Sequence, residues 1–225
     1  MTGLLTRKSG IEIQPLSRET LQDRVYRQVT ELILDGSIVP GEMVTVQSLA
    51  DAFKVSPMPV REALRRLTAE NALTVVSGRS MGIPPLSRER LTDLRNVRFE
   101  LEATAAAWAA ERIGDAALDE LRHHLNAMEK ADQQADVSSY VRANHGFHFA
   151  IYRAAESEIM LHIIETLWLQ ISPYFHLLHD SGNFSMANQR HNEMFSALQQ
   201  RDADAVRASI RADIEAAYQV LIGLL

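Results

Sequence analysis

Residues 48–67 read SLADAFKVSPMPVREALRRL, and this stretch decides the fold of the first part of the chain. Its first half predicts a short helix with Thr45 at its N-cap. Its second half predicts another helix, because Ser56 suits the N-cap position and Pro57 the first helical position. The apolar residues of that second helix fall on one stripe, which leaves on other sides Arg61, Arg65 and Arg66. Two helices joined by so short a turn are typical of a helix-turn-helix.

The flanking sequence completes this unit. Upstream, Ser17 is expected to cap a preceding helix, and Pro40-Gly41 marks the turn that follows it. Downstream, two short strands are predicted around a polar turn, one at residues 73–76 and one at Ile83. Three helices and a hairpin predict a winged helix-turn-helix in residues 1–85.

The remaining residues, 86–225, are predicted to be helical throughout. Pro84-Pro85 stiffens the junction, and Ser87 can cap the helix after it. Segments with helical periodicity then cover residues 88–112, 116–133, 137–155, 158–179, 184–200 and 203–224. Pro173 is expected to kink the fourth of these segments. The sequence therefore predicts a mainly α protein, with an N-terminal winged helix-turn-helix and a C-terminal all-α bundle of about six helices.

Composition and charge limit the class of protein. The chain has 225 residues, no cysteine and a formal net charge of −6. The lack of cysteine excludes disulfides, Cys-ligated zinc and thiol nucleophiles, and no apolar run has the length of a membrane span. We therefore expect a cytoplasmic protein. The acidity is uneven, since residues 1–85 hold 10 Lys and Arg against 9 Asp and Glu, and residues 86–225 hold 13 against 20. An acidic whole is thus compatible with a locally basic face on the first part.

The stretch 48–67 resembles the DNA-binding domain of the GntR family of bacterial transcriptional regulators. The resemblance is carried, in register, by a helix with Leu-Ala, by Val55-Ser56, and by Pro-Val-Arg-Glu-Ala-Leu-x-x-Leu at 59–67. The helical part resembles the FCD effector-binding domain of the FadR-type subgroup, through Arg98-x-x-x-Glu102 and through Asn-His-Gly-Phe-His at 144–148. The resemblance implies a DNA-binding regulator with a helical domain for effector binding and dimerisation.

The resemblance also implies that the arginine-bearing helix lies in the major groove of DNA. Arg61, near the N-terminal end of that helix, is then placed to bond bidentately to O6 and N7 of guanine. Many relatives have an arginine directly after Val-Ser, where this chain has Pro57, so the operator sequence of those relatives does not transfer. The alternative is that the arginines form only a solvated helix face.

Further contacts are expected with the DNA backbone and the minor groove. The residues best placed for phosphates, or able to donate from helix starts, are Arg65, Arg66, Lys54, Ser56 and Thr45. The tip of the wing is expected to enter the minor groove through Arg79 or Gly82.

Four residues could form a divalent metal site in the helical part. Asn144 and His148 share a helical face because they are four residues apart, and a bundle can bring His191 and Asp213 opposite them. By resemblance these positions correspond to the family's Asp, a His four residues later and two further His, so two of the four differ. Asn and Asp oxygens are hard ligands, which moves the expected ion from zinc toward nickel or manganese. The alternative is that these histidines are ordinary packed residues.

Arg98 is the other candidate in the helical part. It lies among apolar residues, where its burial without an anion would be costly, and the resemblance implies that it binds the carboxylate of an effector. An internal ion pair with Glu102, or with Glu100, is the alternative. Tyr152 is expected to line the same pocket, although aromatic residues at helical spacing are more often simply core.

Together these features predict a regulator that binds a palindromic operator as a homodimer, with a small carboxylic or sugar acid modulating its affinity for DNA. Two alternatives are open. A metal-sensing regulator would respond to the ion itself. A metal-dependent hydrolase would use His148, His191 and Asp213, but no general base beyond the ligands is evident and the DNA-reading part would have no role. We therefore do not expect an enzyme.

Overall fold

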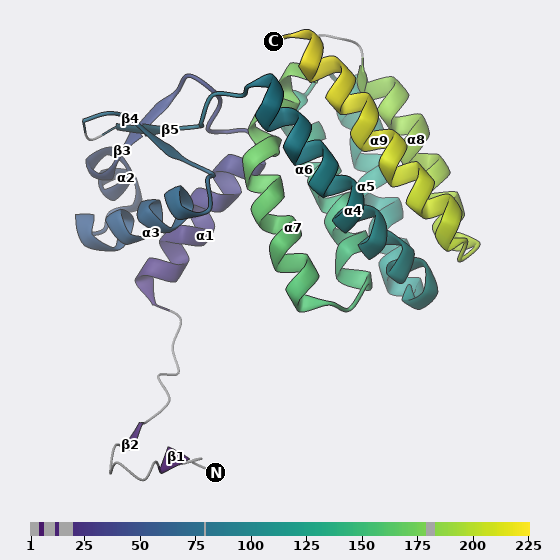
Figure 1. The fold of residues 1–225 in the computed structure, drawn as a ribbon, viewed down its shortest axis with the longest axis horizontal. Helices are drawn as coiled ribbons and strands as arrows, with labels where there is room; N and C mark the ends of the chain where they lie inside the picture. Colours follow the sequence, from purple (N-terminus) through teal and green to yellow (C-terminus); the bar gives the residue numbers. More distant parts are fainter. Residues whose placement is uncertain (1–4, 7–11, 14–19, 79, 179–182) are drawn as a thin grey trace.

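The computed structural model describes residues 5–6, 12–13, 20–78, 80–178 and 183–225, which form a small N-terminal part and a larger helical part (Figure 1). The N-terminal part begins with two short paired strands, β1 (Leu5–Thr6) and β2 (Glu12–Ile13). It continues with α1 (Leu21–Leu34), β3 (Met43–Thr45), α2 (Val46–Phe53), α3 (Pro57–Ala69), β4 (Thr74–Ser77) and β5 (Ser80–Gly82). Three helices with a small sheet confirm the predicted winged helix-turn-helix.

The start of α1 differs from the prediction. The helix begins at Leu21, and its N-cap is Thr20, whose side chain accepts a hydrogen bond from the backbone N–H of Asp23. The Asp23 carboxylate in turn accepts from the backbone N–H of Thr20, at 3.1 Å. This reciprocal capping box satisfies two helix-start donors and fixes the first turn. The predicted cap, Ser17, lies outside the described residues.

The wing contains a strand that the sequence did not predict. The sheet has the order β3-β5-β4, and both pairings are antiparallel. Only a hairpin was expected, and its second strand was predicted at Ile83, whereas β5 covers Ser80–Gly82 and Ile83 follows it. The three residues of β3 are too few to show alternation, and they follow the turn in which Gly41 adopts a positive φ of 94°. By pairing with β5, strand β3 makes the segment between α1 and α2 part of the wing sheet.

The helical part follows the predicted order of segments. Its helices are α4 (Arg88–Arg112), α5 (Asp115–Gln133), α6 (Val137–Ala154), α7 (Glu158–Ile171), α8 (Asn183–Gln199) and α9 (Ala203–Gly223). Side chains at four N-caps accept from the third residue of their helices: Ser87, Asp136, Ser157 and Asp202. The predicted six-helix bundle is confirmed within the described residues.

Pro173 was expected to kink its helix, but the α-helix ends just before it. The α-helix α7 ends at Ile171, and residues Ser172–Leu178 continue as a 3₁₀ helix, η1. Proline lacks the backbone N–H and its ring collides with the carbonyl four residues earlier, so an α-helix is interrupted there. The tighter 3₁₀ winding redirects the side chains of η1, which matters for the site described below.

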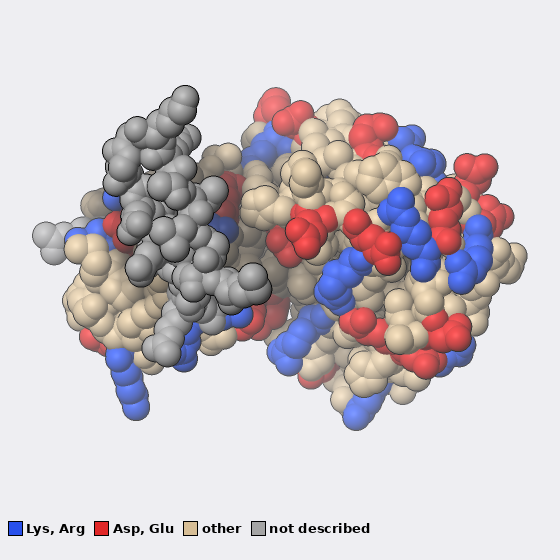
Figure 2. All heavy atoms as spheres, turned by 90° about the horizontal axis from the view of Figure 1, so that it is seen from below, with Lys and Arg blue, Asp and Glu red and all other residues tan. Residues whose placement is uncertain are grey.

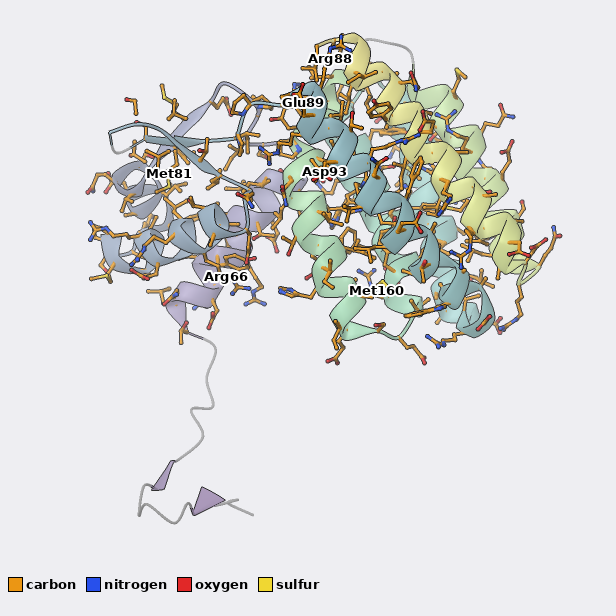
Figure 3. The ribbon with its side chains drawn as sticks, in the orientation of Figure 1. Arg66, Met81, Arg88, Glu89, Asp93 and Met160 are labelled. Carbon is orange, nitrogen blue, oxygen red and sulfur yellow. The ribbon has the colours of Figure 1, made fainter. Side chains whose placement is uncertain are left out.

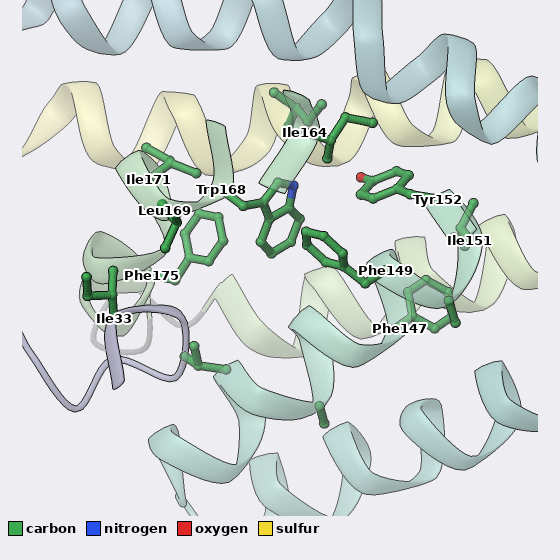
Figure 4. Close-up of a cluster of buried hydrophobic side chains, with 14 of the residues drawn as sticks. Ile33, Phe147, Phe149, Ile151, Tyr152, Ile164, Trp168, Leu169, Ile171 and Phe175 are labelled. Carbon is green, nitrogen blue, oxygen red and sulfur yellow. The ribbon is translucent and has the colours of Figure 1, made fainter. Parts of the chain in front are cut away.

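The bundle core is built around α4 and an aromatic cluster. α4 carries buried alanines at positions 103, 105, 106, 109 and 110, whose small side chains allow α9, α6 and α7 to pack closely against it. Trp168 of α7 lies between Phe149 and Phe175, with Tyr152 nearby (Figure 4). Their edge-to-face arrangement is the favoured geometry for aromatic rings. Among the described residues, no helix is both long and apolar enough to cross a membrane.

Among the described residues, Arg90 and Tyr174 make polar contacts that join the N-terminal part to the bundle. Arg90, near the start of α4, donates from Nη2 to the Asn71 carbonyl at 3.0 Å and to Gln170 Oε1 at 3.2 Å. The Tyr174 hydroxyl of η1 donates to the carbonyl of Pro84 in the linker. Both contacts involve the α7–η1 segment, so a movement of that segment would change how the two parts meet.

Candidate functional site

The turn between α2 and α3 is fixed by the residues at its two ends. Lys54 ends α2 in the left-handed conformation, with φ 54°, and its backbone N–H bonds back to carbonyls of the helix. Ser56 is the N-cap of α3 and Pro57 its first residue, as predicted. The Ser56 side chain makes no capping bond, so its exposed hydroxyl is available to a ligand at the helix start.

One face of α3 packs in the core, so the side chains on its other faces are at least partly exposed to solvent. The apolar stripe is fully buried and consists of Val60, Ala63, Leu64 and Leu67. Arg61, Arg65 and Lys54 are exposed. Arg65 contacts Glu62 at 3.4 Å, but the Arg65 side chain is 71% exposed, so this surface pair is weak and does not prevent a phosphate contact.

Arg66 has a structural contact that was not predicted from the sequence. Its Nε lies 3.0 Å from Glu70 Oε1, and its guanidinium lies 3.7 Å from the centre of the Tyr26 ring. Tyr26 donates its hydroxyl to Glu70 at 2.7 Å, and burial together with Glu70 raises the pKa of Tyr26 to about 12. These three side chains join the end of α3 to α1, and Arg66 is labelled in Figure 3. Arg66 and Glu70 are four residues apart on a predicted helix, and this spacing would have allowed the ion pair to be predicted from the sequence.

The predicted wing-tip residues have different outcomes. Gly82 is buried at the end of β5 remote from the turn, opposite Met43 and Thr74. A Cβ there would lie 2.8 Å from the Glu42 carbonyl oxygen, so the glycine permits close strand approach and is not at the wing tip as expected. Arg79 lies outside the described residues.

Thr45, predicted at the start of α2, is the N-cap of that helix and accepts a hydrogen bond from the Ser48 N–H at 3.0 Å.

The visible surface of the helical part carries charges of both signs. Figure 2 shows acidic and basic side chains interspersed over the helical part. A mixed surface of this kind does not form the single basic face that DNA requires, so the helical part is not expected to contact the phosphate backbone on this side.

Three of the four predicted metal ligands meet inside the bundle. His148 of α6, His191 of α8 and Asp213 of α9 each offer a ligand atom, and these atoms lie within 4.8 Å of one another. The two Nε2 atoms are 3.2 Å apart, and His148 Nε2 is 3.4 Å from Asp213 Oδ2. His191 Nε2 is 3.8 Å from Asp213 Oδ1. Asn144 is half-buried and lines the same cavity one turn before His148.

The chemistry of this cluster fits a divalent cation. Burial lowers the pKa of His191, so its imidazole is neutral. Burial alone would raise the pKa of Asp213, but the adjacent imidazoles, His191 above all, hold it well below its usual value. The Nε2 atoms of His148 and His191 face each other at 3.2 Å, and two ring nitrogens so close need a proton or a cation between their lone pairs. Two imidazole nitrogens and a carboxylate are a common donor set for zinc and similar ions.

Arg98 shows the alternative that the sequence left open, and it also reaches the cavity. Its Nε and Nη2 donate to the two oxygens of Glu102, at 2.5 and 3.2 Å, and both side chains are buried. Although burial opposes its charge, the Glu102 carboxylate holds the pKa of Arg98 above its ordinary value. Arg98 lines the cavity with Asn144 and His148. Glu100 instead pairs with Arg211 on the surface, at 2.7 Å.

Tyr152 is not placed as expected. Its hydroxyl donates to Glu102 at 2.6 Å and lies 3.3 Å from Nδ1 of His148, so it sits behind the histidine and is not among the residues that line the cavity. Burial and the Glu102 carboxylate hold the pKa of Tyr152 well above its usual value, so the phenol is neutral.

Arg190 is a further residue of the site that was not predicted, and its Nε lies 3.4 Å from Asp213 Oδ1. The contact joins α8 to α9, and no spacing within one helix signals it.

The cavity, whose lining includes Arg98, Asn144, His148 and Asp213, is small, at about 40 Å³. That volume holds an ion or a few waters, and a larger molecule requires its walls to move. Two of those walls, Phe175 and Leu178, belong to η1.

An arginine-bearing helix presented by a winged helix-turn-helix, joined to a helical bundle with a buried cavity, defines the class of two-domain DNA-binding regulators. The sequence model described as bacterial regulatory proteins, gntR family, matches residues 21–83, and that of the FCD domain matches residues 93–216. The chain belongs to the GntR family of transcriptional regulators, with an FCD domain as its helical part.

Named relatives and solved structures agree with this assignment. The HTH-type transcriptional regulator McbR of Escherichia coli (strain K12) is 30% identical over 175 residues, which cover 76% of this chain and 79% of McbR. The HTH-type transcriptional repressor RspR of the same strain is 23% identical, over 91% of this chain and 90% of RspR.

A solved structure of E. coli McbR/YncC superposes with a TM-score of 0.84 at 26% identity, covering 92% of this chain and 99% of the other. A putative GntR regulator from Rhodococcus sp. RHA1 shares the fold, with a TM-score of 0.73 at 22% identity, over 89% and 97% of the two chains. McbR and RspR are named as transcriptional regulators, and neither of the two matching family models describes an enzyme.

Proposed function

We propose that the protein is a dimeric regulator that reads a palindromic operator through α3, and that a small carboxylic or sugar acid bound beside a divalent cation sets its affinity for that operator. In this proposal residues 1–85 form the DNA-binding domain and residues 86–225 the effector-binding and dimerisation domain. The two family matches, at 21–83 and 93–216, fall inside these ranges. A dimer suits this role because a two-fold axis in the protein matches a two-fold axis in the operator.

The observation that carries the DNA-reading role is the position of Arg61. It is exposed in the N-terminal half of α3, while the opposite face of that helix is fully buried. Among the described residues, no ion pair holds Arg61 as Glu70 holds Arg66, and a bidentate contact to guanine is the most specific use of a guanidinium. Arg65 and Lys54 flank it as candidates for phosphates.

Replacement of Arg61 tests this role. Arg61→Ala is expected to remove the preference for operator over random DNA, with a loss of about 1–3 kcal/mol per half-site, and to leave thermal unfolding unchanged. The matched control on the same helix, Arg65→Ala, is expected to weaken binding to both DNAs alike and to reduce the salt dependence. An Arg61→Ala protein that still prefers its operator would contradict the assignment.

The residues proposed to hold the cation are His148, His191 and Asp213, with Asn144 as a further oxygen donor. A bound divalent ion would supply a Lewis-acid centre to which carboxylate and hydroxyl oxygens of an acid can attach. Arg98 supports the same ligand class, because only its Nε and Nη2 are used by Glu102 and the side chain lies at the cavity wall. Among the described residues, no hydrogen bond of Arg98 Nη1 is found, so this nitrogen can serve a carboxylate.

The size of the cavity supports regulation by the ligand. A carboxylic acid does not fit into about 40 Å³, so its binding has to displace the walls, of which η1 also contacts the linker. We expect operator affinity to change 5- to 150-fold when an organic acid is added with Mn²⁺. The small cavity also favours one second candidate, a regulator for which the ion itself is the signal. In that case Mn²⁺, Ni²⁺ or Zn²⁺ alone produces the full change and no acid adds to it.

A further inference from the structure

A chain of buried hydrogen bonds leads from Arg98 to the back of His148. Arg98 donates twice to Glu102, at 2.5 and 3.2 Å. Glu102 accepts the Tyr152 hydroxyl at 2.6 Å, and the same hydroxyl oxygen lies 3.3 Å from His148 Nδ1. Glu102 has no exposed surface and Tyr152 is 1% exposed, so water does not compete for these bonds.

The chemistry of these four groups fixes which atom donates in each hydrogen bond. Arginine can only donate, so the Glu102 carboxylate that pairs with it is an acceptor. The Tyr152 proton must therefore point to Glu102, which leaves lone pairs of the phenol oxygen for His148. Nδ1 of His148 then has to be the donor, and Nε2 carries the free lone pair toward His191 and Asp213.

We propose that Tyr152, held by Glu102 and Arg98, is a positioning residue that fixes His148 as the tautomer protonated on Nδ1 and so presents Nε2 to the cation. The proposal rests on the metal site of the proposed function. Histidine ligands commonly have their second ring nitrogen bonded in this way, usually to a carboxylate, a carbonyl or water. Here a tyrosine stands between the histidine and the carboxylate.

His191 provides an internal contrast. Its Nδ1 is buried and has no hydrogen-bond partner among the described residues. Its tautomer is therefore not fixed from behind, and without an ion its proton is best placed on Nε2, facing His148 and Asp213. Only one of the two imidazoles is prepared for a cation before the cation arrives.

The Tyr152→Phe variant isolates the hydroxyl. The phenylalanine ring keeps the packing against Phe149 and Trp168, and only the bond to Glu102 and His148 is lost. Tyr174→Phe is the matched control. Tyr174 is also buried, but it is not among the residues that line the cavity, and its hydroxyl donates to the Pro84 carbonyl.

The test reads the tautomer directly on the full chain without metal. Long-range ¹H–¹⁵N correlation spectra at neutral pH, with the His148 signals assigned by a His148→Gln variant, should show Nδ1 protonated in the unmodified protein and in Tyr174→Phe. In Tyr152→Phe the proton should move wholly or partly to Nε2. Calorimetric titration with Zn²⁺ should then show binding weakened about 10- to 100-fold in Tyr152→Phe and little changed in Tyr174→Phe.

Two results would overturn the inference. One is a His148 protonated on Nε2 in the unmodified protein, and the other is a Tyr152→Phe variant with unchanged tautomer and unchanged zinc affinity. Failure of the proposed function is distinguishable from both: the unmodified protein would then bind no zinc, although His148 still carried its proton on Nδ1 in a Tyr152-dependent way. That outcome supports the tautomer assignment and refutes the metal site.

Discussion

At the scale of single residues, Arg98 shows that a buried charged side chain requires a partner of opposite charge. Its position in an apolar helix predicted an anionic partner, and the structure provides Glu102 four residues along. The sequence could not decide between this ion pair and an effector carboxylate, because both satisfy a buried guanidinium. The structure places Arg98 where it pairs with Glu102 and borders the cavity at once.

The buried pair leads to a stability prediction. Arg98→Ala leaves the fully buried Glu102 carboxylate without its charge partner, so we expect the free energy of unfolding to fall by about 3–5 kcal/mol. The double variant Arg98→Met, Glu102→Gln removes both charges and should recover most of that loss. Chemical denaturation of the three proteins measures both effects. An Arg98→Ala protein as stable as the unmodified one would show that the pair does not need both charges.

At the scale of secondary-structure elements, the segment α7–η1 links the cavity to the DNA-binding part. Phe175 and Leu178 of η1 line the cavity, and Tyr174 of the same short helix donates to the Pro84 carbonyl. The change to 3₁₀ winding at Pro173 allows one short helix to face both ways, since its side chains repeat every three residues.

We therefore predict that Tyr174→Phe weakens the coupling and leaves the two sites intact. Its Zn²⁺ affinity and its operator affinity without ligands should match those of the unmodified protein. The change in operator affinity on adding Mn²⁺ with an effective acid, expected to be 5- to 150-fold in the unmodified protein, should shrink toward unity in the variant. Fluorescence anisotropy with a labelled operator measures the ratio. An equal response in both proteins would show that the signal takes another route.

The same elements show where sequence reasoning was sufficient and where it was not. Caps and periodicity predicted the helices of the bundle, because Ser87, Asp136, Ser157 and Asp202 act locally. Strand β3 was missed, because its stability comes from pairing with β5 and not from its own three residues. His148, His191 and Asp213 were predicted to meet through a resemblance. The contacts of Arg190 and Tyr152 join helices distant in sequence, and only the packing of the bundle determines them.

At the scale of the whole molecule, two parts with different chemistry meet through the packing of α1 against α6, α7 and η1 and through polar contacts of Arg90 and Tyr174. The order of a winged helix-turn-helix and an acidic helical part was evident from charge and periodicity. The contacts between them were not, because Arg90 with Asn71 and Tyr174 with Pro84 bring together residues that no local pattern relates. Because α7 and η1 take part in this junction, we expect a change at the cavity to alter the placement of α3 relative to DNA.

The most direct test of this function is competition between the gene's own promoter region and random duplex DNA for the purified, unmodified protein at moderate salt. We predict that the promoter fragment is bound at least about 10³-fold more tightly than random duplex. Equal affinity for the two DNAs would contradict the claim that α3 reads an operator.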